Sequence, residues 1–303
     1  MKLWNQYYTP ATVHEAVALL SQHAGRARVI AGGTDLLVEM RAEGGHPHEA
    51  LVDITRIPEL SRIEVEDDEI VIGAGVTHTQ IVKSVLLAQR ATCLVESCGV
   101  VGGPQVRNVA TLGGNVAHAL PAADGTTSLV ALDAAADVFL NGEPRQLPLT
   151  DLFIGPGQSR LDSTRDLLLR VRFKGTTPRE ATAFKRIMRP QGVALPILGC
   201  AVWVRLDESH TAFEVARISI APIGPRPGRA HDVEAWLVGQ PASDETIRAA
   251  AAFAQQALHP RTSKYRATAD YRRDMIGVLL RRTLALAVQR VRAGQTIPEG
   301  VGL

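Results

Sequence analysis

The chain has 303 residues, 46% of them hydrophobic, so it can bury a large core and is expected to fold as two or three domains. A net charge of +2, an aromatic content of 4% and the lack of any long basic run exclude a nucleic-acid-binding surface. No run of about 18 apolar residues occurs, and polar residues follow Met1 almost at once, so we expect neither a membrane span nor a signal peptide.

Residues 1–58 are expected to form a small α/β unit. Thr12 and Glu15 have the spacing of a helix capping box, and the apolar positions that follow repeat with a helical period. Short apolar runs predict strands at 28–30 and 50–54.

Residues 59–175 are expected to form a second unit that mixes strands and helices. Gly73 and Gly75 follow a predicted strand and resemble the start of a dinucleotide-binding motif, but His78 occupies the third glycine position, which argues against that motif. The patterns predict strands at 61–65, 69–73, 136–140 and 167–173, and helices at 79–89 and 127–132.

Residues 176–303 are expected to form a C-terminal α+β domain. The boundary is placed in Lys174–Pro178, which is short, polar and ends in proline. Three antiparallel strands backed by helices would give this class of domain. The patterns predict strands at 181–187, 200–206 and 216–221, and helices at 232–237, 244–257 and 269–291.

The sequence predicts no catalytic residue and no metal ligand on this chain. Cys93 and Cys98 have a C-x4-C spacing, but the C-x2-C continuation of an iron–sulfur site is missing. These two residues and Cys200 lie in apolar surroundings and are expected to be buried free thiols. The histidines are dispersed, and no catalytic triad, zinc-protease motif or phosphate-binding loop is present.

Two double-glycine segments carry most of the functional information. Consecutive glycines can adopt positive φ and direct several backbone N–H groups to one point, which makes an anion site. Two such segments facing each other could hold a diphosphate, although a single Gly-Gly pair is more often a plain turn. The segments are Ile30-Ala31-Gly32-Gly33-Thr34-Asp35 and Ala110-Thr111-Leu112-Gly113-Gly114-Asn115.

These segments resemble the FAD-binding medium subunit of the molybdenum hydroxylases, the group of xanthine dehydrogenase, carbon monoxide dehydrogenase and 4-hydroxybenzoyl-CoA reductase. Four further stretches fall in the family's order, so the resemblance covers nearly the whole chain: Tyr8-Thr9-Pro10, Gly102–Asp124, Phe184-Lys185 and Ile223–Ala230. It implies an α+β fold, with an FAD-binding part of the PCMH/VAO type in two subdomains and a C-terminal three-stranded antiparallel sheet with helices.

The resemblance also implies roles for single residues. Both glycine segments would bind the FAD diphosphate, and Asp124 would bond a flavin-side hydroxyl, with helix capping as the alternative. Lys185 would approach the isoalloxazine ring or the phosphates, with a solvated lysine at a strand end as the alternative. Arg107 and Asn108 resemble a pair that shapes the loop through bonds to backbone carbonyls, and His118 is expected to pack or bond locally.

Two departures separate the chain from branches of the family. Ala194 and Leu195 stand where the carbon monoxide dehydrogenase branch has a tyrosine that covers one face of the flavin, which argues against a carbon monoxide substrate. Ala119-Leu120-Pro121 runs straight on to Asp124, without the cysteine-bearing loop of the 4-hydroxybenzoyl-CoA reductase branch.

The function implied is electron transfer through FAD in a cytoplasmic molybdenum hydroxylase. A large partner subunit would hold molybdopterin, a small partner would hold two [2Fe–2S] clusters, and the complex would be an (αβγ)2 assembly. The flavin would pass electrons to NAD⁺, a quinone or oxygen. Two alternatives stay open: a stand-alone FAD-dependent oxidoreductase with its own substrate, and a scaffold with the fold but no cofactor.

Overall fold

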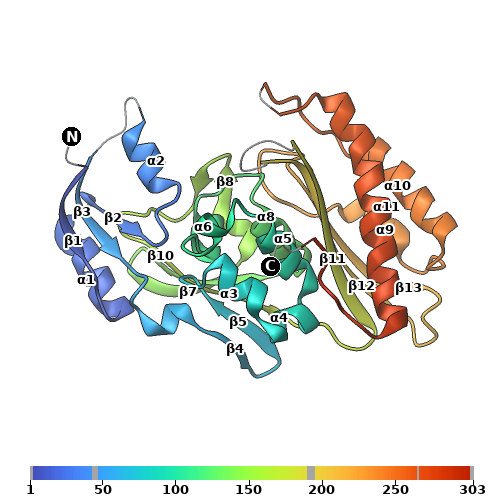
Figure 1. Cartoon of the computed structure of the whole chain (residues 1–303), viewed down its shortest axis with the longest axis horizontal. Helices are drawn as coiled ribbons and strands as arrows, with labels where there is room; N and C mark the ends of the chain where they lie inside the picture. The colour runs from blue at the N-terminus through green and yellow to red at the C-terminus, as the bar shows by residue number, and fades with distance from the viewer. Residues whose placement is uncertain (1–2, 43–46, 190–194, 265, 301–303) are drawn as a thin grey trace.

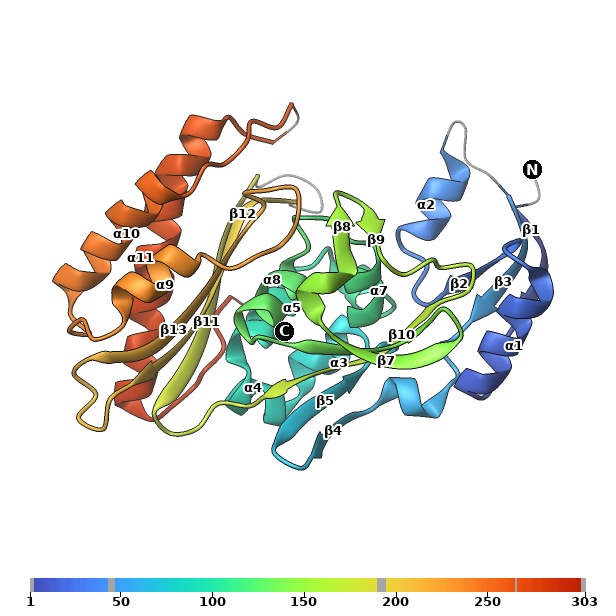
Figure 2. The same cartoon turned by 180° about the vertical axis from the view of Figure 1, so that it is seen from behind.

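The computed structural model describes residues 3–42, 47–189, 195–264 and 266–300. Three main sheets follow one another from the N-terminus to the C-terminal helices, and the same order is seen from both sides (Figures 1 and 2). Helices and strands are mixed throughout, so the α+β class expected from the sequence is confirmed. No helix in the ranges described is long and apolar enough to cross a lipid bilayer.

The N-terminal sheet has three parallel strands in the order β1-β3-β2. The capping box predicted before its first helix is present, since Thr12 Oγ1 accepts a hydrogen bond from the Glu15 amide. The first strand escaped prediction because only its two end residues are even partly buried. The elements are β1 (Trp4–Tyr8), α1 (Val13–His23), β2 (Ala27–Ile30), α2 (Leu36–Arg41) and β3 (His48–Asp53).

The middle sheet has five antiparallel strands in the order β4-β5-β10-β6-β7. Helices α3 to α8 lie between β5 and β6 in the sequence. Its strands are β4 (Ile63–Glu66), β5 (Glu69–Gly73), β6 (Ala135–Leu140), β7 (Glu143–Pro148) and β10 (Leu167–Lys174). The helices are α3 (His78–Lys83), α4 (Val85–Arg90), α5 (Thr92–Gly99), α6 (Pro104–Arg107), α7 (Leu112–Ala117) and α8 (Asp124–Ala131). Short elements complete this part: η1 (Pro58–Ser61), η2 (Leu149–Leu152), β8 (Phe153–Gly155) and β9 (Gln158–Ser159).

The single helix expected at 79–89 is wrong: the segment forms α3 and α4. Ser84 separates them with an extended backbone, and its hydroxyl accepts a hydrogen bond from the Leu87 amide. A serine that caps a new helix competes with continuation of the preceding one, because its side chain replaces a backbone acceptor.

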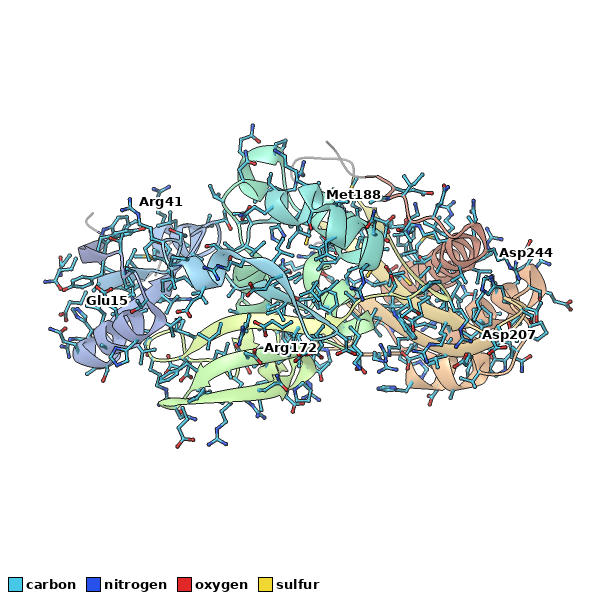
Figure 3. The ribbon with its side chains drawn as sticks, turned by 90° about the horizontal axis from the view of Figure 1, so that it is seen from below. Glu15, Arg41, Arg172, Met188, Asp207 and Asp244 are labelled. Carbon is cyan, nitrogen blue, oxygen red and sulfur yellow. The ribbon has the colours of Figure 1, made fainter. Side chains whose placement is uncertain are left out.

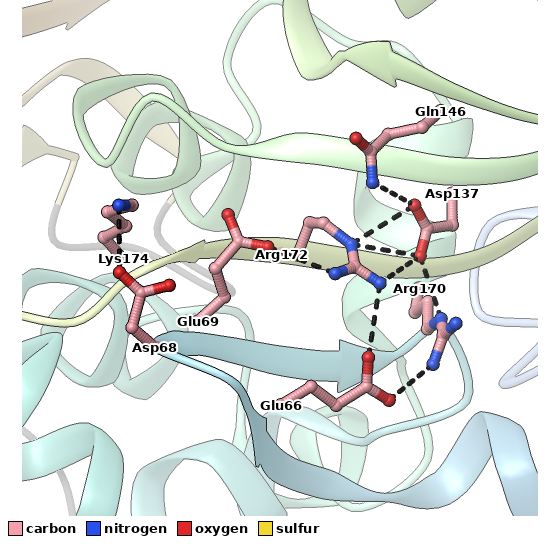
Figure 4. A network of polar contacts seen from close by, with 8 residues as sticks. All are labelled: Glu66, Asp68, Glu69, Asp137, Gln146, Arg170, Arg172 and Lys174. Carbon is pink, nitrogen blue, oxygen red and sulfur yellow. Dashed lines mark hydrogen bonds and ion pairs between the residues drawn. The ribbon is translucent and has the colours of Figure 1, made fainter.

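The middle sheet carries a network of ion pairs (Figure 4). Asp137 on β6 bonds Arg172 at 2.7 Å and Arg170 at 2.9 Å, and these arginines reach Glu66 and Glu69 at the β4–β5 hairpin. Figure 3 shows Arg172 on this sheet, between the N-terminal and C-terminal parts of the chain. The network satisfies the charges along one face of the sheet and contains no group that faces the cleft described below.

The C-terminal sheet has three antiparallel strands, β11 (Glu180–Met188), β12 (Pro196–Leu206) and β13 (Phe213–Ala221), in that order. The central strand is buried at nearly every position because helices cover both of its faces, α11 on one side and α8 on the other. A strand buried on both faces has apolar residues at nearly every position of its sequence and does not alternate between apolar and polar ones. The helices are α9 (His231–Leu237), α10 (Asp244–Ala257) and α11 (Ala269–Ala293), so the predicted sheet with helices is confirmed.

A buried ion pair joins the C-terminal helices to the middle part. Arg290 on α11 and Glu96 on α5 pair with side chains that are only 4% and 1% exposed. Glu96 also accepts a hydrogen bond from the Phe184 amide at 2.7 Å. These contacts fix β11 against α5 and thereby place the residues after Phe184 beside the start of α8.

Candidate functional site

A cleft of about 1110 Å³ runs between the glycine segments, the start of α8 and the C-terminal sheet. Its volume slightly exceeds the usual range of small-molecule and cofactor sites, about 300–1,000 Å³, so a ligand as large as a dinucleotide can be accommodated. The two glycine segments, far apart in sequence, line the same cleft. Of the predicted site residues, those of 30–35, Ala110, Thr111, Gly113, Gly114, Asn115 and Asp124 line it, whereas Lys185 does not.

The first glycine segment has the properties of an anion site. Gly33 has φ +65°, which an L side chain rarely adopts. A Cβ on Gly32 would stand 2.1 Å from the Val109 carbonyl oxygen, so this glycine lets the second segment approach. Within the described ranges, the amides of residues 31–35 donate no hydrogen bond to any protein group. Several amides left free at the wall of a cleft suit a bound anion.

The second glycine segment differs from the amide nest that we expected. It forms the first turn of α7, where the Thr111 hydroxyl accepts a hydrogen bond from the Gly114 amide at 3.0 Å. The amides of Leu112 and Gly113 donate to the carbonyls of Val76 and Ala74, and the Asn115 amide donates to Thr111. The amides of residues 112–115 are therefore already paired.

The glycines of this second segment have two other roles. One allows close packing of the backbone, and the other leaves the wall of the cleft free of a side chain. A Cβ on Gly113 would lie 2.5 Å from the Ala74 carbonyl oxygen, whereas one on Gly114 would meet only Thr111 Oγ1, at 3.2 Å. Gly114 is exposed and lines the cleft. A ligand can therefore lie directly against the α7 backbone at Gly114.

Asn115 and Asp124 position the start of α8. Asn115 Oδ1 accepts hydrogen bonds from the amide and the hydroxyl of Thr126, at 3.2 and 3.3 Å. Asp124 does not cap this helix: the N-cap is Ala123, and the Asp124 carboxylate instead accepts a hydrogen bond from Arg186 Nη1 at 2.6 Å. Burial raises the pKa of Asp124 to about 6, although the charges of Arg186 and Arg266 oppose this change.

Lys185 and Arg186 lie on opposite sides of β11. Lys185 Nζ pairs with Glu299 and stays outside the cleft, whereas Arg186 lines it. Arg266, from the loop before α11, lines the same part of the cleft. Sequence reasoning missed both arginines, since the alternation along a strand does not say which side faces a ligand, and no motif marks Arg266.

The remaining polar residues of the wall stabilise its loops. Arg107 Nη1 donates to the carbonyls of Val101 and Gly102, at 3.3 and 3.0 Å, so its expected role in shaping this loop is confirmed. His78 is buried, its Nδ1 has no partner in the described part of the chain, and burial lowers its pKa to about 4. Its imidazole is therefore neutral at pH 7.

His118 follows the second glycine segment and reaches the first. Its ring nitrogens lie 3.8 Å from a carboxylate oxygen of Asp35 and 3.5 Å from one of Glu39, so its polar contacts are with the first segment and α2, whereas we expected local packing or bonding. Leu195 lines the cleft with 57% of its surface exposed, while Ala194 lies outside the described residues.

Comparison with known proteins explains this cleft. Residues 3–173 match the family described as FAD binding domain in molybdopterin dehydrogenase, and residues 182–287 match the CO dehydrogenase flavoprotein C-terminal domain. The chain belongs to this family. It is an FAD-binding medium subunit of the molybdenum hydroxylases, and hence an oxidoreductase subunit whose cofactor is FAD. Members of this family work in complexes with further subunits.

Individual relatives align along nearly their whole length. The carbon monoxide dehydrogenase medium chain of Hydrogenophaga pseudoflava is 31% identical over 94% of this chain and 97% of its own. The xanthine dehydrogenase FAD-binding subunit of Escherichia coli O157:H7 is 29% identical, over 93% and 95%. A solved structure of the H. pseudoflava enzyme without the Mo-pyranopterin moiety has a TM-score of 0.87 at 30% identity, covering 96% of this chain and 99% of that one.

The flavoprotein cleft fits the cofactor by its chemistry. Free amides at residues 31–35 can take the diphosphate, and the exposed backbone at Gly114 lets the cofactor lie close. Charged side chains, among them Asp124, Asp162 and Arg186, also line the cleft.

Proposed function

We propose that this subunit passes electrons from the [2Fe–2S] clusters of a small partner to an external acceptor, while a large molybdopterin subunit oxidises the substrate. The observation that carries the proposal is the cleft itself, with free amides in one wall and an exposed glycine in the other. Bound FAD would supply the exchange of single electrons for an electron pair.

The proposed contacts follow the cleft from the diphosphate outward. The amides of residues 31–35 would hold the diphosphate, with Gly33 giving the backbone its turn. Thr111 would fix α7 so that Gly114 lies under the cofactor, and Asn115 would hold α8 so that Asp124 stays in the wall. Lys185 is not included, because its ammonium group pairs with Glu299 outside the cleft.

We infer an (αβγ)2 assembly and a cytoplasmic location from the family and from the cysteines. All three cysteines are buried and free, as expected of a chain that stays in a reducing compartment. The division into domains at 1–58, 59–175 and 176–303 is also proposed, with partial support from separate hydrophobic clusters in the N-terminal and C-terminal parts. Limited proteolysis would test these boundaries.

The first experiment is to purify the chain, record its absorption spectrum, and release and identify the bound cofactor. About one FAD per chain supports the proposal, and co-purification of two further subunits separates it from a stand-alone flavin enzyme. A colourless protein that takes up no added FAD would refute the proposal and favour a scaffold. A yellow chain that oxidises a substrate without partners would favour the stand-alone oxidoreductase.

A further inference from the structure

A second groove, of about 710 Å³, has no lining residue in common with the cleft between the glycine segments. Residues of the segment 130–151, from the end of α8 to η2, line one wall. Residues of the segment 226–231, from the loop between β13 and α9, line the other. The groove therefore lies where the middle part of the chain meets the C-terminal part, and its volume falls within the range of small-molecule sites.

The first wall of this groove offers apolar surface. Ala135, Leu147 and Pro148 line it, and each keeps part of its surface exposed to solvent. Covering these residues with an organic group removes apolar surface from water, which favours binding. A ligand with an apolar body therefore gains more in this groove than a bare inorganic ion does.

Two carboxylates beside the loop are already paired with arginines. Asp133 lines the groove, and its carboxylate lies 3.1 Å from Arg229 Nη1 and 3.8 Å from Arg217 Nη2. Glu234 on α9 pairs with Arg229 Nη2 at 2.8 Å. Two guanidinium groups thus balance two carboxylates, so these acidic residues oppose the entry of an anion only weakly.

Arg226 is the charged residue of the loop that has no counter-ion. It is exposed and lines the groove, and within the described ranges its guanidinium forms no ion pair or hydrogen bond. Its backbone amide also donates to no group there. Pro225 and Pro227 flank it, and their rings restrict the backbone on both sides, so less conformational freedom is lost when a ligand binds. A guanidinium together with a free amide suits a carboxylate or a phosphate.

We propose that this second groove binds a small organic anion, a carboxylate or phosphate ester with an apolar body. The anionic group lies against the guanidinium and amide of Arg226, and the apolar body covers Ala135, Leu147 and Pro148. Asp151, on the first wall, is exposed and has no cationic partner in the described part of the chain, so it keeps the anionic group at the loop. The site shares no residue with the FAD cleft, so this inference goes beyond the proposed function and does not rest on it.

The test is a calorimetric titration of the chain with two probes, benzoate and phenyl phosphate. Saturating FAD is present, so that the free amides of residues 31–35 are occupied. Arg226→Gln removes the charge at the loop, and Asp151→Asn removes the opposing charge from the first wall. Arg248→Gln is the matched control, because Arg248 is also exposed and without a partner among the described residues but lies outside the groove.

We expect the wild type to bind at least one of the probes, one molecule per chain, with a dissociation constant on the order of 1 mM for ligands of this size. Arg226→Gln should weaken binding about tenfold, because a hydrogen bond to a charged group is lost. Asp151→Asn should strengthen binding about twofold, and Arg248→Gln should equal the wild type. The bound probe should also raise the melting temperature of the wild type, and at the same concentration it should raise that of Arg226→Gln less.

Failure of the wild type to bind either probe well above this concentration would overturn the inference, and so would equal binding by the wild type and Arg226→Gln. If Arg226→Gln does not fold, Asp151→Asn decides: strengthened binding supports the inference, and unchanged or weakened binding overturns it. These outcomes leave the proposed function intact, because the varied residues lie outside the FAD cleft. A wild-type chain that binds no FAD would refute the proposed function instead, and the comparison of variants would still decide whether this groove binds an anion.

Discussion

Gly114 offers a direct way to block the cleft without disturbing the fold. An added Cβ there meets only the Thr111 hydroxyl, at 3.2 Å, and otherwise points into open space, because Gly114 is exposed in the wall. The branched side chain in Gly114→Val would therefore occupy volume that the cofactor needs. At Gly32, by contrast, the Cβ would stand 2.1 Å from a backbone oxygen, so Gly32→Ala would disturb the protein itself.

The effect on binding can be bounded. Forcing extra methyl groups into a packed contact costs typically about 1–3 kcal/mol, which corresponds to a dissociation constant for FAD raised roughly 5- to 150-fold. The effect on folding is small, because valine has a helix propensity better than that of glycine by a few tenths of a kcal/mol. The displaced Thr111 hydroxyl costs at most the value of a helix cap, about 1 kcal/mol.

The assay is a titration of the FAD-free chain with FAD, followed by quenching of flavin fluorescence, beside urea unfolding of the same protein. The control is Gly228→Val, at an exposed glycine where an added Cβ meets no atom within 4 Å and which lies outside this cleft. We expect normal binding by the control. Wild-type affinity in Gly114→Val would refute the placement of the cofactor against α7.

Three further predictions concern charge and backbone strain. Because the native pKa of Asp124, about 6, exceeds its ordinary value of 3.8, ionising it costs native stability as the pH rises from about 4 to 6. Urea unfolding of the FAD-free chain at a series of pH values would test this. The free energy of unfolding of the wild type, relative to that of Asp124→Asn, should fall through this window by up to about 1.4 kcal/mol per pH unit. The same pH dependence of unfolding free energy in both proteins would contradict the prediction. Glu96→Gln leaves Arg290 buried without its partner and should cost about 3–5 kcal/mol of unfolding free energy; Arg290→Met in the same chain should restore part of it, and an additive loss would argue against the pair. Gly33→Ala forces a side chain into φ +65°, so we expect a loss of about 1–2 kcal/mol and weaker FAD binding, which calorimetry and the same titration would check.

The sequence by itself determined the family and most of the elements. The helix signal at Thr12 and the periodic runs of the C-terminal part reflect local forces, capping and amphipathic burial, which are written in neighbouring residues. The glycine segments could be recognised because close backbone approach accepts only glycine, as at Gly32 and Gly113.

Tertiary structure decided which groups are available to the cofactor. Whether an amide is free depends on distant partners: Val76 and Ala74 pair the amides of Leu112 and Gly113, while nothing in the described ranges accepts those of residues 31–35. α5 is buried on every side between other elements, so it lacks the periodic pattern that would have predicted it. The orientation of the side chains on β11 was also decided by tertiary structure. The C-terminal sheet packs against α5 and α8, and this packing directs Arg186 into the cleft and Lys185 toward Glu299. The local sequence could not predict this, because burial depends on how the layers assemble.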